Sequence, residues 1–315
     1  MSDARTILFR RLIDDAGLFP PARKPITEAV ADHRRARAGE TASILGRFLC
    51  PARRLSELAE AGAEPDWELG AIASPEGDWR AALRAELEEV AGYDGPGAIR
   101  ALELPLRGEP RASEAIAIAR EEAGAASLEP SIELFLELPS PSVEVLEALA
   151  AAREGEDGPR PAAKLRCGGP KASSIPADEL VAGFIAGCRR LGVPFKATAG
   201  LHHPFREADP ETGALQHGFV NLLAAAALSA EDEGEPGAEE LAPVIAERDP
   251  AAFSLDASGI AWRDRPAGAS AIVRARELFR SYGCCSFSEP VEGLIEHGLL
   301  ESDLAPVEAE PGIDG

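Results

Sequence analysis

The sequence lacks any apolar segment long enough to cross a membrane, which takes about 20 consecutive apolar residues. Its most apolar stretch, FVNLLAAAALSA at 219–230, is much shorter. The N-terminal segment MSDARTILFRRLIDDAGLF places charges inside its apolar run and has no small-residue cleavage site. We therefore expect neither a membrane-spanning helix nor a signal peptide.

Cysteine is also scarce, and its spacing excludes a disulfide scaffold. The chain has five cysteines, an odd number, and no pair with the C-x-x-C spacing. This pattern argues against a disulfide framework and predicts a cytoplasmic protein. The adjacent Cys284 and Cys285 are interpreted as small buried hydrophobic residues, which is the usual role of a free cysteine.

Basic residues are few compared with acidic ones. The chain has 32 Lys and Arg against 54 Asp and Glu, a formal net charge of -22. A field of this sign repels phosphate backbones and anionic lipid head groups, so neither nucleic acid nor a membrane surface is an expected partner. The acidic residues are spread along helical segments, which indicates a solvated surface.

What the sequence does contain is a regular alternation of short apolar runs with longer segments of helical spacing. The predicted strands are 11–19, 43–51, 67–75, 98–106, 131–139, 161–169, 193–201 and 252–262. The segments between and after them are predicted helices, among them AIVRARELFRSYG at 271–283. This alternation predicts βαβ units and a parallel sheet.

Eight such units predict an α/β fold of the (β/α)₈ barrel type, as a single domain over residues 1–304. The aperiodic residues 305–315 are predicted to form a flexible tail. An open, doubly wound sheet is the alternative. It is disfavoured because no G-x-G-x-x-G turn follows the first strand, and we expect no cofactor.

The predicted strand ends carry polar residues, and the ends of barrel strands are where catalytic groups lie. Side chains alternate along a strand, so Lys164 shares a face with Arg166, and Lys196 shares a face with Thr198. We expect these faces to point into the barrel. The candidate site residues in chain order are Asp15, Arg47, Glu103, Glu137, Lys164, Arg166, Lys196, Thr198, His202 and His203.

Two lysines inside a barrel need opposite charges nearby, because an unpaired buried ion costs several kcal/mol. Glu103 and Glu137, on the neighbouring strands, can supply these charges and shuttle protons. Either Lys164 or Lys196 could be the amine nucleophile. A lysine attacks a carbonyl group only as a neutral amine, and a nearby cation with partial burial lowers its pKa. The same cations could instead bind a substrate carboxylate or phosphate without covalent chemistry.

Two of these segments resemble the deoxyribose-phosphate aldolases, class I aldolases with a barrel fold. FKATAG at 195–200 is similar to that family's strand-seven segment, and AKLRCGG at 163–169 stands where the family has its strand-six lysine. The resemblance implies that Lys164 forms a Schiff base and that Lys196 lowers its pKa. Leu165 and Arg166 stand where that family has hydroxyl residues. The whole chain also resembles a bacterial family of barrel proteins, which implies the fold but no activity.

The combined interpretation is a barrel enzyme that acts on a small metabolite bearing a carbonyl, carboxylate or phosphate group, by lyase chemistry of the aldolase kind. One alternative is a metal-assisted hydrolase or isomerase that uses histidines and acids at the barrel mouth. We expect no metal, because the H-x-H and H-E-x-x-H spacings are absent. The other alternative is a non-catalytic barrel that binds a small anion. Two further histidines, His33 and His297, are predicted surface residues, and the oligomeric state is left open.

Overall fold

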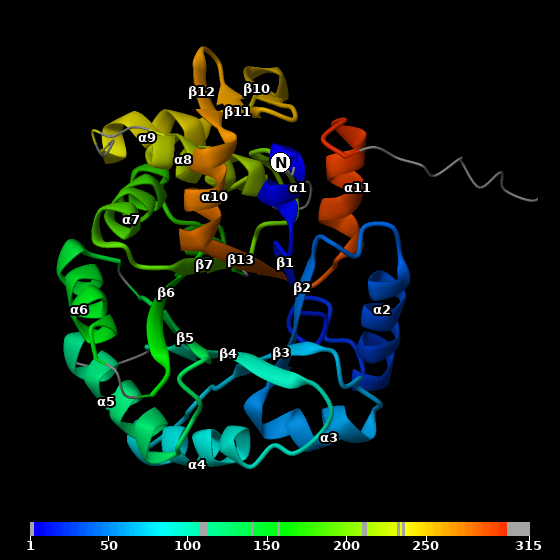
Figure 1. Ribbon diagram of the computed structural model, residues 1–315, viewed down its shortest axis with the longest axis vertical. Helices are drawn as coiled ribbons and strands as arrows, with labels where there is room; N and C mark the ends of the chain where they lie inside the picture. The colour runs from blue at the N-terminus through cyan, green and yellow to red at the C-terminus, as the bar shows by residue number, and fades with distance from the viewer. Residues whose placement is uncertain are drawn as a thin grey trace, which may run out of the picture.

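The computed structural model describes residues 3–106, 112–139, 141–155, 158–169, 171–209, 213–231, 234 and 237–300. Eight parallel strands close into a barrel, and helices surround it (Figure 1). The fold is therefore the predicted (β/α)₈ barrel. The last predicted barrel residues, 301–304, and the predicted tail at 305–315 lie outside the described residues.

The barrel strands follow one another around the ring in chain order, and the last strand closes it against the first. Every neighbouring pair is parallel, including the closing pair of the first and last strands. The strands are β1 (Ile13–Asp15), β2 (Leu45–Pro51), β3 (Glu68–Ile72), β4 (Ala98–Pro105), β5 (Glu133–Glu137), β6 (Arg160–Arg166), β7 (Phe195–Thr198) and β13 (Phe279–Cys284). The first seven overlap the predicted strands.

The prediction for the eighth strand was wrong. Residues 252–262 form β10 (Phe253–Leu255) and β11 (Gly259–Trp262), which join β12 (Arg265–Gly268) in a small antiparallel sheet outside the barrel. The eighth barrel strand is β13, in the segment predicted to continue a helix. That helix, α10 (Ala269–Leu278), ends where β13 begins. Pairing of β13 with both β1 and β7 outweighs the local helical pattern, and its Phe279 and Tyr282 are fully buried.

The remaining helices cover the barrel. They are α1 (Ala4–Phe9), α2 (Ile26–Ala38), α3 (Leu55–Glu60), α4 (Trp79–Ala91), α5 (Ala112–Ala125), α6 (Val143–Arg153), α7 (Asp178–Leu191), α8 (Phe219–Glu231), α9 (Ala238–Ala246) and α11 (Ser288–Glu296). The apolar run noted in the sequence is α8, which is buried from Phe219 to Ala230 because α7, α9, α10 and the outer sheet surround it. Within the described ranges, no helix has the length and hydropathy needed to cross a bilayer.

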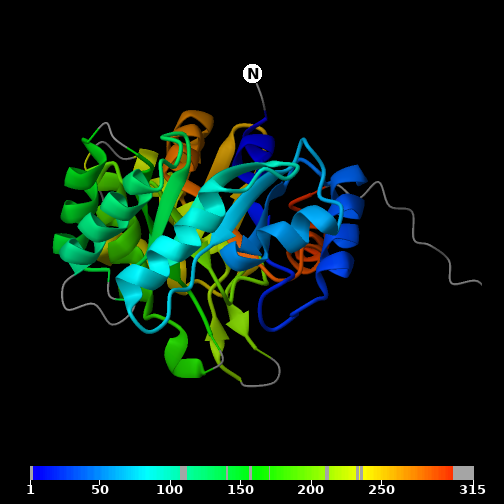
Figure 2. The ribbon, with the colours of Figure 1, turned by 90° about the horizontal axis from the view of Figure 1, so that it is seen from below.

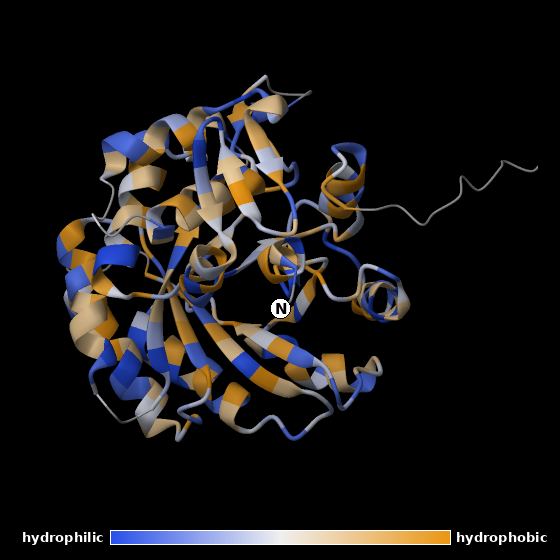
Figure 3. Cartoon of the chain, turned by 45° about the horizontal axis from the view of Figure 1, so that its top comes forward, coloured by the Kyte–Doolittle hydropathy of each residue, from blue (hydrophilic) through white to orange (hydrophobic). Residues whose placement is uncertain are grey.

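The barrel strands carry hydrophilic residues between hydrophobic ones, as the alternating bands in Figure 3 show. On β6, Ala163 and Leu165 pack in the main hydrophobic core, whereas Lys164 between them is not part of this core. Small interior residues leave room for the long charged side chains. A Cβ atom at Gly46, for example, would lie 2.4 Å from a carboxylate oxygen of Asp14.

The loops that follow β6 and β7 project together from one end of the barrel, opposite the end where the chain begins (Figure 2). Two short strands in the loop after β7, β8 (Glu207–Ala208) and β9 (Leu215–Gln216), pair as a hairpin. At the base of these loops the backbones of Gly168 and Gly200 meet. A Cβ atom on Gly168 would lie 2.8 Å from the Cα atom of Gly200. We call this end, formed by the carboxyl ends of the strands, the mouth.

Gly168→Ala should destabilise the protein, because the new methyl group meets backbone that cannot rotate away. We expect the free energy of unfolding to fall by roughly 1–3 kcal/mol, the usual cost of overpacking. The matched control is Gly124→Ala in α5, where nothing lies within 4 Å of the added Cβ atom. That change should stabilise the helix by roughly 0.5–1 kcal/mol. Urea denaturation measures both, and equal effects of the two changes would contradict the close contact.

Candidate functional site

Lys196 of β7 is fully buried inside the barrel, between two carboxylates. Its Nζ atom lies 2.6 Å from Oδ2 of Asp14 and also donates a hydrogen bond to Oε1 of Glu103. Ser281 of β13 donates a further hydrogen bond of 2.6 Å to the same oxygen of Asp14. The centre of the barrel is therefore an ion cluster in which every charge has a partner.

Lys164 of β6 extends this cluster toward the mouth. Its Nζ atom lies 2.7 Å from Oε2 of Glu103 and 3.1 Å from Oε2 of Glu137. The other oxygen of Glu137 accepts a hydrogen bond of 2.9 Å from Nε of Arg166, whose side chain is 41% exposed. Opposite charges thus alternate from the buried centre to solvent. We call Asp14, Lys196, Glu103, Lys164, Glu137 and Arg166, in this order, the charge ladder.

The carboxylates of the charge ladder set the protonation of Lys164. Burial by itself lowers the pKa of Lys164, but the attraction of Glu103 and Glu137 outweighs burial, and the pKa is raised. Burial likewise raises the pKa of Glu137, yet Lys164 and Arg166 bring it down to about 2. The expectation that a neighbouring cation lowers the pKa of Lys164 is therefore wrong for this state, because the groups nearest to its ammonium are anions.

Arg47 lies toward the amino ends of the strands, away from the mouth, but it contacts the charge ladder, because its Nη1 atom lies 3.7 Å from Oδ2 of Asp14. It stands near the start of β2, and its Nη2 atom lies 3.0 Å from Oε2 of Glu133, the first residue of β5. It lines a cavity of about 520 Å³ at the amino ends of the strands, together with Arg100 and Arg280. The prediction placed Arg47 at the carboxyl end of its strand, but the observed β2 runs from Leu45 to Pro51, and Arg47 is its third residue.

Asp15 lies at the mouth but is occupied by structural contacts. One carboxylate oxygen accepts a hydrogen bond from the backbone of Gly17, and the other lies 3.0 Å from Nδ1 of His33. His33 is 1% exposed and packs edge-on against Trp67, so the prediction that it is a surface residue was wrong. Asp15 is the partner of Nδ1 there, whereas the buried Nε2 atom of His33 has no hydrogen-bond partner among the described residues. The other predicted surface histidine, His297, is exposed.

The two adjacent histidines point to different partners. Nδ1 of His203 lies 3.0 Å from a carboxylate oxygen of Glu207 on the hairpin, and both side chains are well exposed. Nδ1 of His202 lies 2.6 Å from Oε2 of Glu289 in the first turn of α11. Thr198 ends β7 on the same loop and is half-buried. Of these three predicted residues, His202 is the one that lies beside buried cysteine side chains.

Those neighbours are Cys284 and Cys285, which sequence reasoning interpreted only as buried hydrophobic residues. The Sγ atom of Cys285 lies 4.0 Å from Nε2 of His202, and that of Cys284 lies 3.8 Å from Nδ1. The prediction missed this group because it placed the eighth strand at 252–262. With β13 as the eighth strand, the GCCSFSEP segment directly follows a barrel strand, which is the signal that could have revealed the site.

The backbone beside His202 is strained. Ala199 has a φ angle of 63°, in the left-handed region that residues with a side chain seldom occupy. Gly200 follows with a φ angle of 70°, which glycine adopts without a penalty. Strain of this kind collects at functional sites, where the surrounding structure must hold it in place. The strained Ala199 therefore indicates that the surrounding structure holds the loop after β7 in this conformation.

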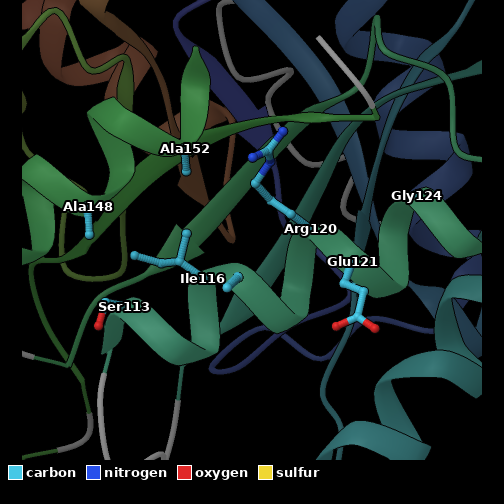
Figure 4. Close-up of a pocket in the computed structure, with 8 residues that line it drawn as sticks. Ser113, Ile116, Arg120, Glu121, Gly124, Ala148 and Ala152 are labelled. Carbon is cyan, nitrogen blue, oxygen red and sulfur yellow. The ribbon is translucent and has the colours of Figure 1, made fainter. Parts of the chain in front are cut away.

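A further cavity lies outside the barrel, away from every candidate residue (Figure 4). Its volume is about 450 Å³, and it is formed where Ile116 and Arg120 of α5 face Ala148 and Ala152 of α6. Its lining combines small and apolar residues with Ser113, Arg120 and Glu121, and it includes none of the predicted site residues. In the part of the chain that the structure describes, no three His, Cys, Asp or Glu side chains are grouped so as to hold a metal ion.

Comparison with known proteins gives no family for the chain. No model of a protein family matches it, and a search of curated proteins found no match either. The site must therefore be interpreted from its own geometry.

Lys196→Met should destabilise the protein strongly, because it leaves Asp14 and Glu103 buried without their shared cation. Removing one partner of a buried ion pair typically costs about 3–5 kcal/mol. Lys24→Met is the matched control, since Lys24 pairs with Asp32 where both side chains are partly exposed. The control should cost less than about 1 kcal/mol. Thermal and urea denaturation report both losses, and a neutral Lys196→Met would show that the charge ladder does not hold the barrel centre.

Proposed function

We propose that the chain is an enzyme that acts at the barrel mouth on a small carbonyl metabolite bearing a carboxylate or phosphate group. The chemistry is of the lyase or aldolase kind, with Lys164 as the amine nucleophile. The observation that carries the proposal is the contact of Glu137 with both Lys164 and Arg166. It links a buried amine to a partly exposed guanidinium through a single carboxylate.

Arg166 is the group that meets the substrate first. Its guanidinium contacts Glu137 mainly through Nε at 2.9 Å, with a longer contact of 3.5 Å from Nη2. The exposed edge of the guanidinium is therefore open to a second anion. Carboxylates and phosphates bind arginine through paired hydrogen bonds, so a substrate anion competes with Glu137 for Arg166.

That competition supplies the neutral amine. The hydrogen bond and the charge of Arg166 both help to lower the pKa of Glu137. When Arg166 turns to the substrate, Glu137 regains basicity and accepts a proton from the Lys164 ammonium 3.1 Å away. The amine then attacks the substrate carbonyl, Glu137 gives its proton to the hydroxyl of the carbinolamine, water leaves, and a protonated imine forms. Glu103 stays paired with Lys196 and keeps the site close to neutral.

The lyase step follows from the imine. The protonated imine accepts the electron pair of the carbon–carbon bond that breaks, the Glu137 carboxylate takes the proton of the substrate hydroxyl, and an aldehyde leaves. Glu137 is then placed to return that proton to the carbon fragment that remains on the enzyme. Hydrolysis of that imine frees the product and restores the Lys164 amine.

A second candidate function is the binding of a small anion without turnover. The raised pKa of Lys164 favours it, because an ammonium that keeps its proton binds an anion but does not attack a carbonyl. In that case Arg166 and Lys164 would clamp a carboxylate or phosphate. Chemical trapping separates the two candidates.

Borohydride added with a panel of small aldehydes and keto acids should reduce the imine to a stable amine on Lys164. The chain has four lysines, Lys24, Lys164, Lys171 and Lys196, so peptide mapping assigns the added mass directly. Lys164→Met should abolish trapping, and Lys171→Met, at an exposed lysine, should leave it unchanged.

Arg166→Gln is the second variant, because it keeps Lys164 and its buried partners in place. It should slow trapping by anionic substrates more than trapping by neutral aldehydes. If no compound gives an adduct on Lys164, while small anions still raise the melting temperature, the aldolase proposal fails and anion binding is the function.

A further inference from the structure

The mouth holds a second reactive group that the charge ladder does not use. His202 comes from the loop after β7, Cys285 follows β13 directly, and Glu289 lies in the first turn of α11. These three elements are distant in sequence, yet they bring a thiol, an imidazole and a carboxylate into contact. The position is the carboxyl end of the last two barrel strands, where this fold carries catalytic groups.

The contacts follow the order of a nucleophile, a base and a group that orients the base. Nε2 of His202 faces Sγ of Cys285 at 4.0 Å, and Nδ1 on the other side of the ring lies 2.6 Å from Oε2 of Glu289. The Nδ1–H group therefore donates to Glu289, and Nε2 is left to take the thiol proton. This arrangement is the one that activates cysteine and serine nucleophiles on unrelated folds.

We propose that Cys285 is a nucleophile for acyl transfer, with His202 as its base and Glu289 as the residue that positions His202. The substrate class is a small activated acyl compound, an ester or a thioester. The thiol proton passes to Nε2 of His202, the thiolate attacks the acyl carbon, and the leaving group takes the proton from His202 as its bond breaks, which leaves a thioester on Cys285. Neutral His202 then takes a proton from water, the hydroxide attacks the thioester, and His202 returns the proton to the sulfur of Cys285 as the carbon–sulfur bond breaks and a carboxylic acid is released.

The protonation of the group agrees with this assignment. The hydrogen bond from Cys284 and the contact with His202 outweigh burial and lower the pKa of Cys285 to about 5. Hydrogen bonds with Cys285 and Glu289 raise the pKa of His202 to about 9, also against burial. Cys284 is the opposite case, because its hydrogen bond to Cys285 and its burial raise its pKa well above the usual range. Only one of the two adjacent thiols is thus activated.

The other cysteines provide an internal control. Burial raises the pKa of Cys50 and of Cys167 to about 12, and it raises that of Cys188 well above the usual cysteine value. At neutral pH all three are thiols in the core, and thiols are poor nucleophiles. A reagent that modifies cysteine as its thiolate should therefore select Cys285 in the intact protein.

The test is acylation of the full chain by p-nitrophenyl acetate, followed by peptide mapping. One acetyl group should appear on Cys285, with a burst of p-nitrophenolate equal to the protein concentration. The rate at which iodoacetamide alkylates Cys285 should increase with pH, with a midpoint at about pH 5. This midpoint lies below the usual cysteine pKa of about 8.5. Below the midpoint the thiolate is protonated and the rate should fall.

Four variants separate the roles. Cys285→Ser should abolish the burst, and His202→Gln should slow acylation at pH 7 by roughly 100-fold or more, the usual share of a positioned base. Glu289→Gln should give a smaller loss and move the pH midpoint of alkylation upward, which a purely structural role would not do. Glu292→Gln, exposed on the same helix, is the matched control and should behave as the unaltered chain.

Three outcomes would overturn the proposal. The first is acetylation spread over several residues at the rate of free cysteine. The second is an alkylation midpoint near 8.5. The third is a disulfide bond between Cys284 and Cys285 in freshly purified protein, seen as the loss of two hydrogens in its mass. Such a bond would make the pair a redox group. None of these outcomes depends on whether Lys164 is trapped by borohydride, so the two proposals fail separately.

Discussion

The structure depends on the pairing of Lys196 with Asp14 and Glu103 at the centre of the barrel. A (β/α)₈ barrel is normally filled by layers of branched apolar side chains, and here a buried ammonium occupies that space between two carboxylates. Ions in such a place are stable only when each has its partner, so the first pair requires the next. Lys164 neutralises the second oxygen of Glu103, and Glu137 neutralises Lys164. Toward the mouth this sequence of charges ends at the partly exposed Arg166, and on the other side Asp14 pairs with Arg47, which pairs with Glu133.

This dependence separates the mouth, where the proposed chemistry lies, from the centre of the barrel. Lys196 has carboxylates on both sides and no route to solvent, whereas Arg166 is partly exposed and can exchange Glu137 for another anion. Any such exchange changes the charge seen by Lys164, which is the step that the proposed chemistry needs. The thiol of Cys285 lies at the same end of the barrel but is served by other residues, His202 and Glu289. The mouth thus presents an amine and a thiol whose protonation is controlled by separate partners.

The sequence predicts the barrel and the interior lysines, because both follow from strong periodic signals. Alternation along β6 and β7 is enough to place Lys164 and Lys196 on the inward face, beside Glu103 and Glu137. Three features could not be predicted for physical reasons. FRSYGC is a strand only because β1 and β7 pair with it, the surroundings of His33 come from the packing of α2, and the sign of the pKa shift of Lys164 depends on distances to carboxylates. The error at the eighth strand also hid Cys285, since its position at the mouth follows from β13.

The central claim is that carboxylates outweigh burial and keep Lys164 charged until Arg166 engages an anion. Its most direct test is an NMR titration of protein labelled at the lysine ε-carbons, in which four signals are resolved and assigned by substitution. The account predicts that Lys164 titrates above the usual value of about 10.4 in the free protein. It also predicts that a small carboxylate bound to Arg166 raises the pKa of Glu137, because Arg166 helps to lower it in the free protein, and a label at the glutamate carboxyl carbons reports this change. A Lys164 that titrates near pH 7 in the free protein, or a Glu137 whose pKa does not respond to the anion, would contradict the account.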